Sequence, residues 1–164
     1  MALSKAMNNK LNDQITSEFY SSQLYLAMAC MFEDLGLKML AKLFRKQTEE
    51  ERSHALKFVD YIAAVQGTVR LDAIPEAAAK YRTVQAAIDA ALAHEHKVTD
   101  QIHALVALAE KEKDYQTHSF LKWFVDEQVE EVDSQVHLSQ IARMAGDHLL
   151  AIEAYIRSPQ ARLA

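Results

Sequence analysis

The stretch TEEERSHALKFVDY, Thr48–Tyr61, has the periodicity of an amphipathic helix, but its apolar face is interrupted. Steps of four and three residues follow one face of a helix. On this face the sequence has Leu40, Phe44, Gln47, Glu51, His54, Phe58, Tyr61 and Val65. Gln47, Glu51 and His54 lie in the middle of the face, where burial makes a carboxylate and an imidazole costly. The burial of these two groups one turn apart therefore requires a compensating interaction, which the rest of the sequence must supply.

The composition favours long helices over strands. Half of the 164 residues are hydrophobic, and only three are glycine and two are proline. A chain of this length makes one domain with a substantial core. The single cysteine, Cys30, excludes an intramolecular disulfide and any cysteine-rich zinc or rubredoxin-type iron module.

Charge and hydropathy indicate where in the cell the protein is expected and which classes of partner are excluded. The N-terminal stretch MALSKAMNNK has no apolar segment of signal-peptide length, and no uninterrupted apolar run could span a bilayer. The net charge of −5, without a basic patch or tail, argues against nucleic acid. We therefore expect a soluble, cytoplasmic protein with neither a nucleic acid nor a membrane as partner.

Helical periodicity covers nearly the whole chain. Four long helices are expected at about 4–32, 38–66, 83–113 and 115–145, and a short fifth helix at about 147–157. Gly36, Gly67 and Gly146 follow three of these segments, as glycine often does at helix C-termini. No linker or low-complexity tract divides the chain, so residues 1–164 are predicted to form a single domain.

The connections predict the topology. The turns after the first and third helices are so short that each helix must be antiparallel to the next one. A helix of 28 residues is about 42 Å long, and the sixteen residues of Gly67–Arg82 can span about 50 Å when extended. This segment can therefore cross the length of the bundle. The predicted fold is all-α: a four-helix bundle with one long crossover between the second and third helices.

Each long helix repeats the interruption of the apolar face. The corresponding faces contain Leu11, Ile15, Glu18, Ser22, Tyr25, Ala29 and Phe32; Val84, Ile88, Ala91, Glu95, Val98, Ile102, Leu105 and Ala109; and Leu121, Phe124, Gln128, Glu131, Gln135, Leu138 and Ala142. One polar residue on a single helix could fix the register, as asparagine does in coiled coils. Four carboxylates at one depth would be prohibitively costly without positive charge.

Two divalent cations would balance the four negative charges of these glutamates. Carboxylates with one imidazole suit iron(II) or manganese, with zinc as a competitor. The three-residue step from Glu51 to His54 puts both side chains on one helix face, and two metals about 3.5–4 Å apart form a recognised catalytic arrangement. An offset of 77 residues also maps Glu18 onto Glu95, Glu51 onto Gln128 and His54 onto Glu131. The sequence thus predicts a dinuclear metal site in the core.

These residues resemble the bacterial non-haem ferritins of the ferritin-like di-iron carboxylate family, over essentially the full length. The most specific stretches are NDQITSEFYSSQLYL (Asn12–Leu26), EEERSHALKFVDY (Glu49–Tyr61), HEH (His94–His96) and EKDYQTHSFLKWFVDEQVEE (Glu112–Glu131). Bacterioferritins have a second Glu-x-x-His motif and a haem-ligating methionine directly after the bridging glutamate. This chain has one such motif and has Arg52 at that position, so no haem is expected.

The resemblance implies a role for each residue of the site. The implied iron ligands are Glu18, Glu51 and His54 for the first ion and Glu95 and Glu131 for the second, with Glu51 bridging. Gln128 would lie beside the pair and position oxygen or water. Tyr25 would be a redox-active neighbour, although an ordinary core tyrosine explains it equally well. Glu50, Glu127 and Glu130 match a third iron site just inside the cavity wall.

The resemblance also implies a function. Ferritins of this kind are ferroxidases: they oxidise iron(II) with O2 or H2O2 and store it as a ferric mineral inside a hollow shell of 24 identical subunits. The rival interpretations are a dinuclear oxygenase, a rubrerythrin-type peroxidase and a purely structural bundle. Aerobic addition of iron(II) separates them, because only a ferritin retains far more iron than one pair per subunit.

Residues outside the predicted site are expected to have structural roles. The other histidines are assigned to the surface or to interfaces: His94, His96, His103, His118, His137 and His148. Trp123 is assigned to packing. The apolar segment 149–156 is too short to be stable alone. We expect other subunits to cover it, and the alternative is packing across the end of its own bundle.

Overall fold

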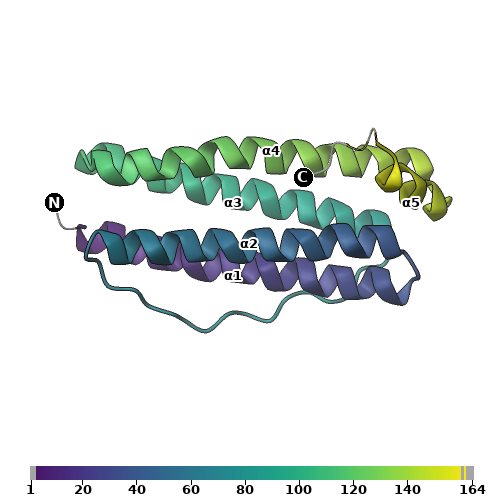
Figure 1. Ribbon diagram of the computed structural model, residues 1–164, viewed down its shortest axis with the longest axis horizontal. Helices are drawn as coiled ribbons and strands as arrows, with labels where there is room; N and C mark the ends of the chain where they lie inside the picture. The colour runs from purple at the N-terminus through teal and green to yellow at the C-terminus, as the bar shows by residue number, and fades with distance from the viewer. Residues whose placement is uncertain (1–2, 160, 162–164) are drawn as a thin grey trace.

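The computed structural model describes residues 3–159 and 161, and its helices form a bundle with one long crossover (Figure 1). The helices are α1 (Lys5–Asp34), α2 (Lys38–Ala64), α3 (Val84–Glu112), α4 (Tyr115–Ala145) and α5 (Leu149–Arg157). This arrangement confirms the predicted fold class. Among the described residues, no helix is both long and apolar enough to cross a membrane.

Side-chain caps fix the starts of three long helices. Ser4, Thr83 and Asp114 each accept a hydrogen bond of 3.0 Å from the backbone N–H three residues further on. These bonds satisfy N–H groups that have no partner within the helix. At the end of α4, Gly146 adopts a φ of +55°, which a residue with a Cβ rarely does. The helix ends lie within about two residues of the sequence prediction, as different assignments usually do.

The crossover, residues 65–83, runs the length of the bundle beside α1 (Figure 1). The buried side chain of Asn12 holds its start. The Asn12 Nδ2 group donates to the Thr68 carbonyl at 2.9 Å, and its Oδ1 accepts from the Arg70 backbone N–H at 2.5 Å. The chain therefore returns to the far end before α3 begins, so α3 runs parallel to α2.

The hydrophobic core is divided into two clusters. One contains Phe32, Leu40, Phe44, Ile88 and Leu138, and packs near the α5 end of the bundle; the other contains Leu11, Ile15, Phe58, Ile102 and Phe124, and fills the opposite half. Between these clusters every long helix contributes buried polar side chains. The two apolar clusters thus hold the four helices on both sides of a polar layer and fix the position of that layer.

The short helix α5 packs on its own bundle. Ile152 is only 1% exposed and belongs to the cluster near this end, whereas Leu150 is 78% exposed. The Glu153 carboxylate accepts hydrogen bonds from the backbone N–H groups of Met39 and Leu40 at 2.8 and 2.9 Å. It thereby caps α2, which has no side-chain cap of its own. The expectation that other subunits cover this segment is therefore wrong for Ile152, because one face of α5 fits its own chain.

Replacing Glu153 should weaken this end of the bundle. Glu153→Ala removes two hydrogen bonds and a negative charge from the α2 N-terminus, and we expect a loss of about 1 kcal/mol of stability, as for other helix caps. Chemical unfolding followed by circular dichroism would measure it. Asp147→Ala, which removes an exposed carboxylate just before α5, is the matched control, and equal unfolding midpoints for the two variants in the same assembly state would contradict the capping role.

Candidate metal centre

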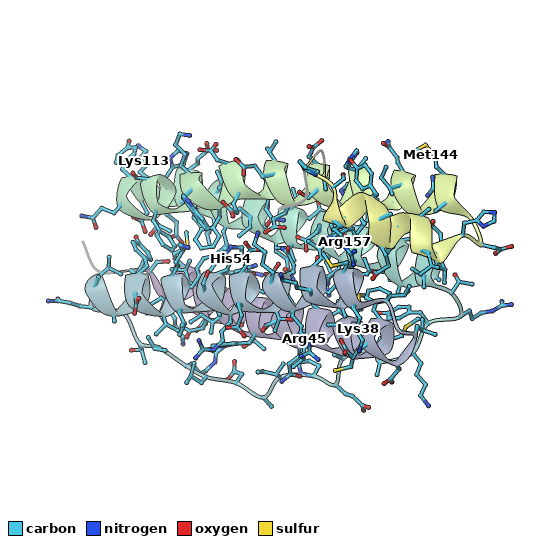
Figure 2. All side chains as sticks on the ribbon, turned by 45° about the vertical axis from the view of Figure 1, so that its right-hand side comes forward. Lys38, Arg45, His54, Lys113, Met144 and Arg157 are labelled. Atoms are coloured by element: carbon cyan, nitrogen blue, oxygen red, sulfur yellow. The ribbon has the colours of Figure 1, made fainter. Side chains whose placement is uncertain are left out.

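The polar layer lies well inside the bundle. In Figure 2, His54 lies between the two bundle ends, which are marked by Lys113 in the turn between α3 and α4 and by Met144 near the end of α4. Each long helix contributes one glutamate, and all four are at most 2% exposed: Glu18, Glu51, Glu95 and Glu131. The structure therefore brings together the four carboxylates that the apolar faces predicted.

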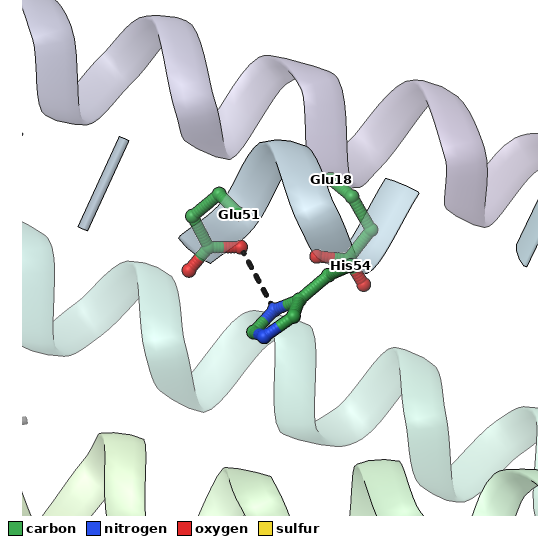
Figure 3. A group of neighbouring side chains, drawn as sticks. All are labelled: Glu18, Glu51 and His54. Atoms are coloured by element: carbon green, nitrogen blue, oxygen red, sulfur yellow. Dashed lines mark ion pairs between the residues drawn. The ribbon is translucent and has the colours of Figure 1, made fainter. Parts of the chain in front are cut away.

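One half of the layer is a cluster of two carboxylates and an imidazole. Ligand atoms of Glu18, Glu51 and His54 lie within 4.8 Å of one another. Figure 3 shows Glu18 reaching down from α1 toward the two side chains of α2. His54 Nδ1 lies 3.5 Å from Glu51 Oε2, and all three side chains are buried. This is a donor set that can hold a divalent cation.

The other half of the layer has a different arrangement. Gln47 donates to Glu131 Oε2 at 2.5 Å. Glu95 accepts hydrogen bonds from the Tyr25 hydroxyl and, at 3.3 Å, from Gln128 Nε2. Tyr25 is fully buried and Gln128 is 6% exposed, so both touch the carboxylate layer directly. The structure thus brings all seven residues predicted for the paired site into one layer.

The carboxylates raise one another's pKa values. Burial, and then the charges of Glu95 and Glu131, raise the pKa of Glu51 well above its ordinary value. Burial and the charge of Glu51 raise the pKa of Glu18 in the same way. Burial and the charge of Glu95 raise the pKa of Glu131 to about 8. The layer therefore lacks positive charge, and protons or metal cations must supply it at neutral pH.

Glu18 shows where a cation fits. One of its oxygens, Oε1, accepts from Gln14 Nε2 at 2.8 Å, while Oε2 is buried and has no hydrogen-bond partner among the described residues. A buried carboxylate oxygen without a partner is costly. A metal ion bound to Oε2 would remove that cost, so the donor set and its unsatisfied atom both fit a cation.

The residues expected at a third site do not meet in one cluster. Glu127 forms a group with His54 and Glu131, in which one ligand atom from each lies within 4.8 Å of the others. Glu50 pairs with Lys46 at 3.1 Å instead. Glu130 is exposed. The two groups of ligand atoms found among the described residues contain neither Glu50 nor Glu130.

One histidine is not where the sequence placed it. His94, expected at the surface or an interface, is 8% exposed, and its Nε2 lies 2.7 Å from the Ser21 hydroxyl between α3 and α1. Burial, and then the charge of Lys97, lower the pKa of His94 to about 4. The side chain is therefore a neutral part of the core, because α3 is buried over a wider arc than its single apolar face indicates.

Sequence reasoning also missed contacts made by other side chains of the layer. Gln14 and Gln47 bind two of the glutamates. The apolar face of its helix had singled out Gln47 without assigning it a contact, whereas the only signal for Gln14 was its position four residues before Glu18. Trp123, assigned to packing, meets the His54 ring edge-on with 5.4 Å between ring centroids. A bundle with such a layer defines a candidate dinuclear metal protein.

Comparison with known proteins gives the family. A family model for the ferritin-like domain matches residues 8–144. Ferritin BfrB of Mycolicibacterium smegmatis is 38% identical over 94% of this chain and 86% of its own length. A bacterial non-heme ferritin of Staphylococcus haemolyticus is 35% identical over 88% of each chain. The chain belongs to the ferritin family, as its resemblance to bacterial non-haem ferritins indicated.

A solved structure supports the same assignment. The open pore ferritin from the hyperthermophilic archaeon Archaeoglobus fulgidus superimposes with a TM-score of 0.92 and is 38% identical. The match covers 96% of this chain and 98% of that one. The shared fold therefore extends over nearly the whole molecule.

The raised pKa of Glu131 makes the stability of the metal-free protein depend on pH. Between its ordinary value near 4.5 and about 8, Glu131 holds a proton in the folded chain that the unfolded chain releases. Its contribution to stability is thus complete below pH 4.5 and disappears as the pH rises through 8. We expect the metal-free protein to melt at least about 2–4 °C lower near pH 8 than near pH 4.5. A loss of about 1 kcal/mol of stability lowers the melting temperature by this amount in a chain of this size.

Differential scanning calorimetry of metal-free protein in one assembly state would measure this difference. Glu131→Gln should reduce it, because the amide does not titrate. Glu49→Gln, at an exposed glutamate of the same helix as Glu51, should leave it unchanged. A melting temperature that rises toward alkaline pH in the wild type would contradict the prediction.

Proposed function

We propose that this protein is an iron-storage ferritin whose subunit oxidises iron(II) at a paired site. The proposed ligands are Glu18, Glu51, His54, Glu95 and Glu131. The observation that carries the proposal is the single buried layer to which each of the four long helices contributes one glutamate, with His54 among them. A structural bundle would have no reason to bury four carboxylates at one level.

Iron(II) is the substrate of the proposed reaction. Two iron(II) ions lose one electron each, and one O2 accepts both electrons with two protons to give H2O2. With H2O2 as the oxidant, the two electrons and two protons give two waters instead. The charge of two metal ions balances the four carboxylates, and oxidation adds further positive charge. The iron(III) product would then move from the carboxylate layer to a ferric mineral.

Each side chain of the layer has a task in this proposal. Glu51 would bridge the two ions. His54 supplies the single nitrogen ligand, through Nδ1, the nitrogen that faces Glu51. Tyr25, bonded to Glu95, would supply or hold a proton or an electron beside the second ion. Gln128 would orient oxygen or water with its amide.

A third iron site on Glu50, Glu127 and Glu130 would connect the pair with the mineral. Glu127 supports this, because its Oε1 lies 3.9 Å from His54 Nε2 and it is partly exposed. Glu50 has a buried oxygen, Oε2, without a hydrogen-bond partner among the described residues. The three carboxylates would converge only when iron binds to them.

The remaining partners follow from membership of the family. We propose that 24 copies of the chain form a hollow shell that encloses the mineral, without haem, in the cytoplasm. The exposed apolar side chain of Leu150 on α5 is free to contact a neighbouring subunit. Sizing of the native particle and measurement of its iron after aerobic loading test the whole proposal. A small particle that retains only one pair of irons per subunit would point to an oxygenase instead.

Loss of the bridging ligand should stop rapid oxidation. We expect Glu51→Ala to slow iron(II) oxidation by at least about 10-fold, since even outer-shell partners of metal ligands contribute 10–100-fold. Stopped-flow absorbance of ferric products measures the rate. Glu49→Ala, which removes an exposed carboxylate two residues away, is the control, and wild-type speed in Glu51→Ala would refute the assignment of the site.

Removal of Glu130 should affect turnover and leave the paired site intact. We expect Glu130→Ala to bind and oxidise the first pair of irons normally, but to change the ratio of oxygen consumed to iron oxidised, or to slow the later turnovers. Oxygen-electrode measurements with successive iron additions would show this. Asp133→Ala, at another exposed acidic position on α4, is the control. An unchanged ratio and turnover in Glu130→Ala would count against a third site.

A further inference from the structure

Two buried amides contact the carboxylate layer from outside the proposed ligand set. Gln14 on α1 and Gln47 on α2 are each 4% exposed. Each donates a hydrogen bond from Nε2 to a carboxylate oxygen: Gln14 to Glu18 at 2.8 Å and Gln47 to Glu131 at 2.5 Å. Burying an amide this deeply is costly unless its hydrogen bonds are made. These two amide–carboxylate hydrogen bonds are therefore structural elements of the carboxylate layer.

The Gln14 contact distinguishes the two oxygens of Glu18. The amide occupies Oε1 and leaves Oε2 buried without a partner among the described residues. In Figure 3 this carboxylate lies beside His54, its neighbour in the candidate metal cluster. Oε2 is consequently the oxygen that is free to bind a cation.

The Gln47 contact acts on the other half of the layer and joins two helices. Gln47 lies one turn before Glu51 on α2, yet its amide reaches across to Glu131 on α4. It occupies Glu131 Oε2, so Oε1 is the oxygen left for a ligand role. The same hydrogen bond also ties α2 to α4 at the level of the site.

We propose that Gln14 and Gln47 are positioning residues that make Glu18 and Glu131 bind metal through one chosen oxygen each. The inference rests on the proposed function, because it assumes that these two glutamates are ligands. An amide N–H2 group donates only and carries no charge. It can therefore fix a carboxylate without competing for the cation or adding to the negative charge of the layer.

The two amides would act on different ligands. Gln14 acts on Glu18, a ligand of the first ion. Gln47 acts on Glu131, a ligand of the second ion, and also contacts Glu51. Without its amide, either carboxylate could rotate and offer both oxygens to one ion, which changes the number of ligands around the metal. Partners that orient metal ligands typically contribute 10–100-fold to affinity or activity.

Cobalt(II) binding tests this proposal without any oxidation step. The probe is added to metal-free assembled protein, and its d–d absorption reports the number of ligands around each ion. Gln14→Met and Gln47→Met keep the side-chain length and remove the donor. We expect each variant to bind one of the two ions about 10-fold more weakly, with a changed d–d band, and the double variant to weaken both.

Matched variants complete the test. Gln101→Met removes an amide that contacts Ser17 between α1 and α3, outside the layer, and should bind cobalt as the wild type does. If a methionine variant fails to fold by circular dichroism, Gln14→Asn or Gln47→Asn, which moves the amide back by one methylene, should show the same weakening.

The outcomes separate this inference from the proposed function. Wild-type affinities and d–d bands in both single variants would overturn the positioning role alone. A wild-type protein that binds no pair of cobalt ions would overturn the paired site itself, and this inference with it.

Discussion

The structure depends on one electrostatic constraint: four carboxylates share a buried layer in which a single imidazole is the only candidate for positive charge among the proposed ligands. Such a layer is tolerable only when protons or cations neutralise it. Burial and mutual repulsion raise the pKa values of these carboxyl groups, so the metal-free chain retains protons that metal ions can displace. The proposed metal site is for this reason strained when no cation is bound.

The rest of the bundle holds this layer in place. Two apolar clusters lie on either side of it, and aromatic packing such as that of Phe58 against Phe124, 4.2 Å between ring centroids, fixes the helices nearby. Caps at Ser4, Thr83 and Asp114 set where three of the helices begin. Because a shift of one helical residue would turn a glutamate out of the layer, these ordinary stabilising features also control the register of the site.

Much of the fold and of the carboxylate layer could be predicted from the sequence, since both follow from helical periodicity. The apolar faces place Glu18, Glu51, Glu95 and Glu131 at one level, and the long segment before α3 indicates the crossover. Periodicity along one face could not show how wide the buried arc is, which is why His94 was misplaced. Contacts between distant segments, such as Glu153 with α2, depend on tertiary packing that no local pattern encodes.

The cap that Glu153 places on α2 has a consequence for the synthesis of the chain. The cap and the N–H group of Leu40 that it binds are 113 residues apart, so α2 emerges from the ribosome long before the group that completes its first turn. Until translation reaches α5, the helix that carries Glu51 and His54 lacks this cap at its N-terminal end. The nascent chain therefore cannot form this cap until nearly all of the protein has been made. A translation product that ends before Glu153 would lack the two hydrogen bonds to the start of α2.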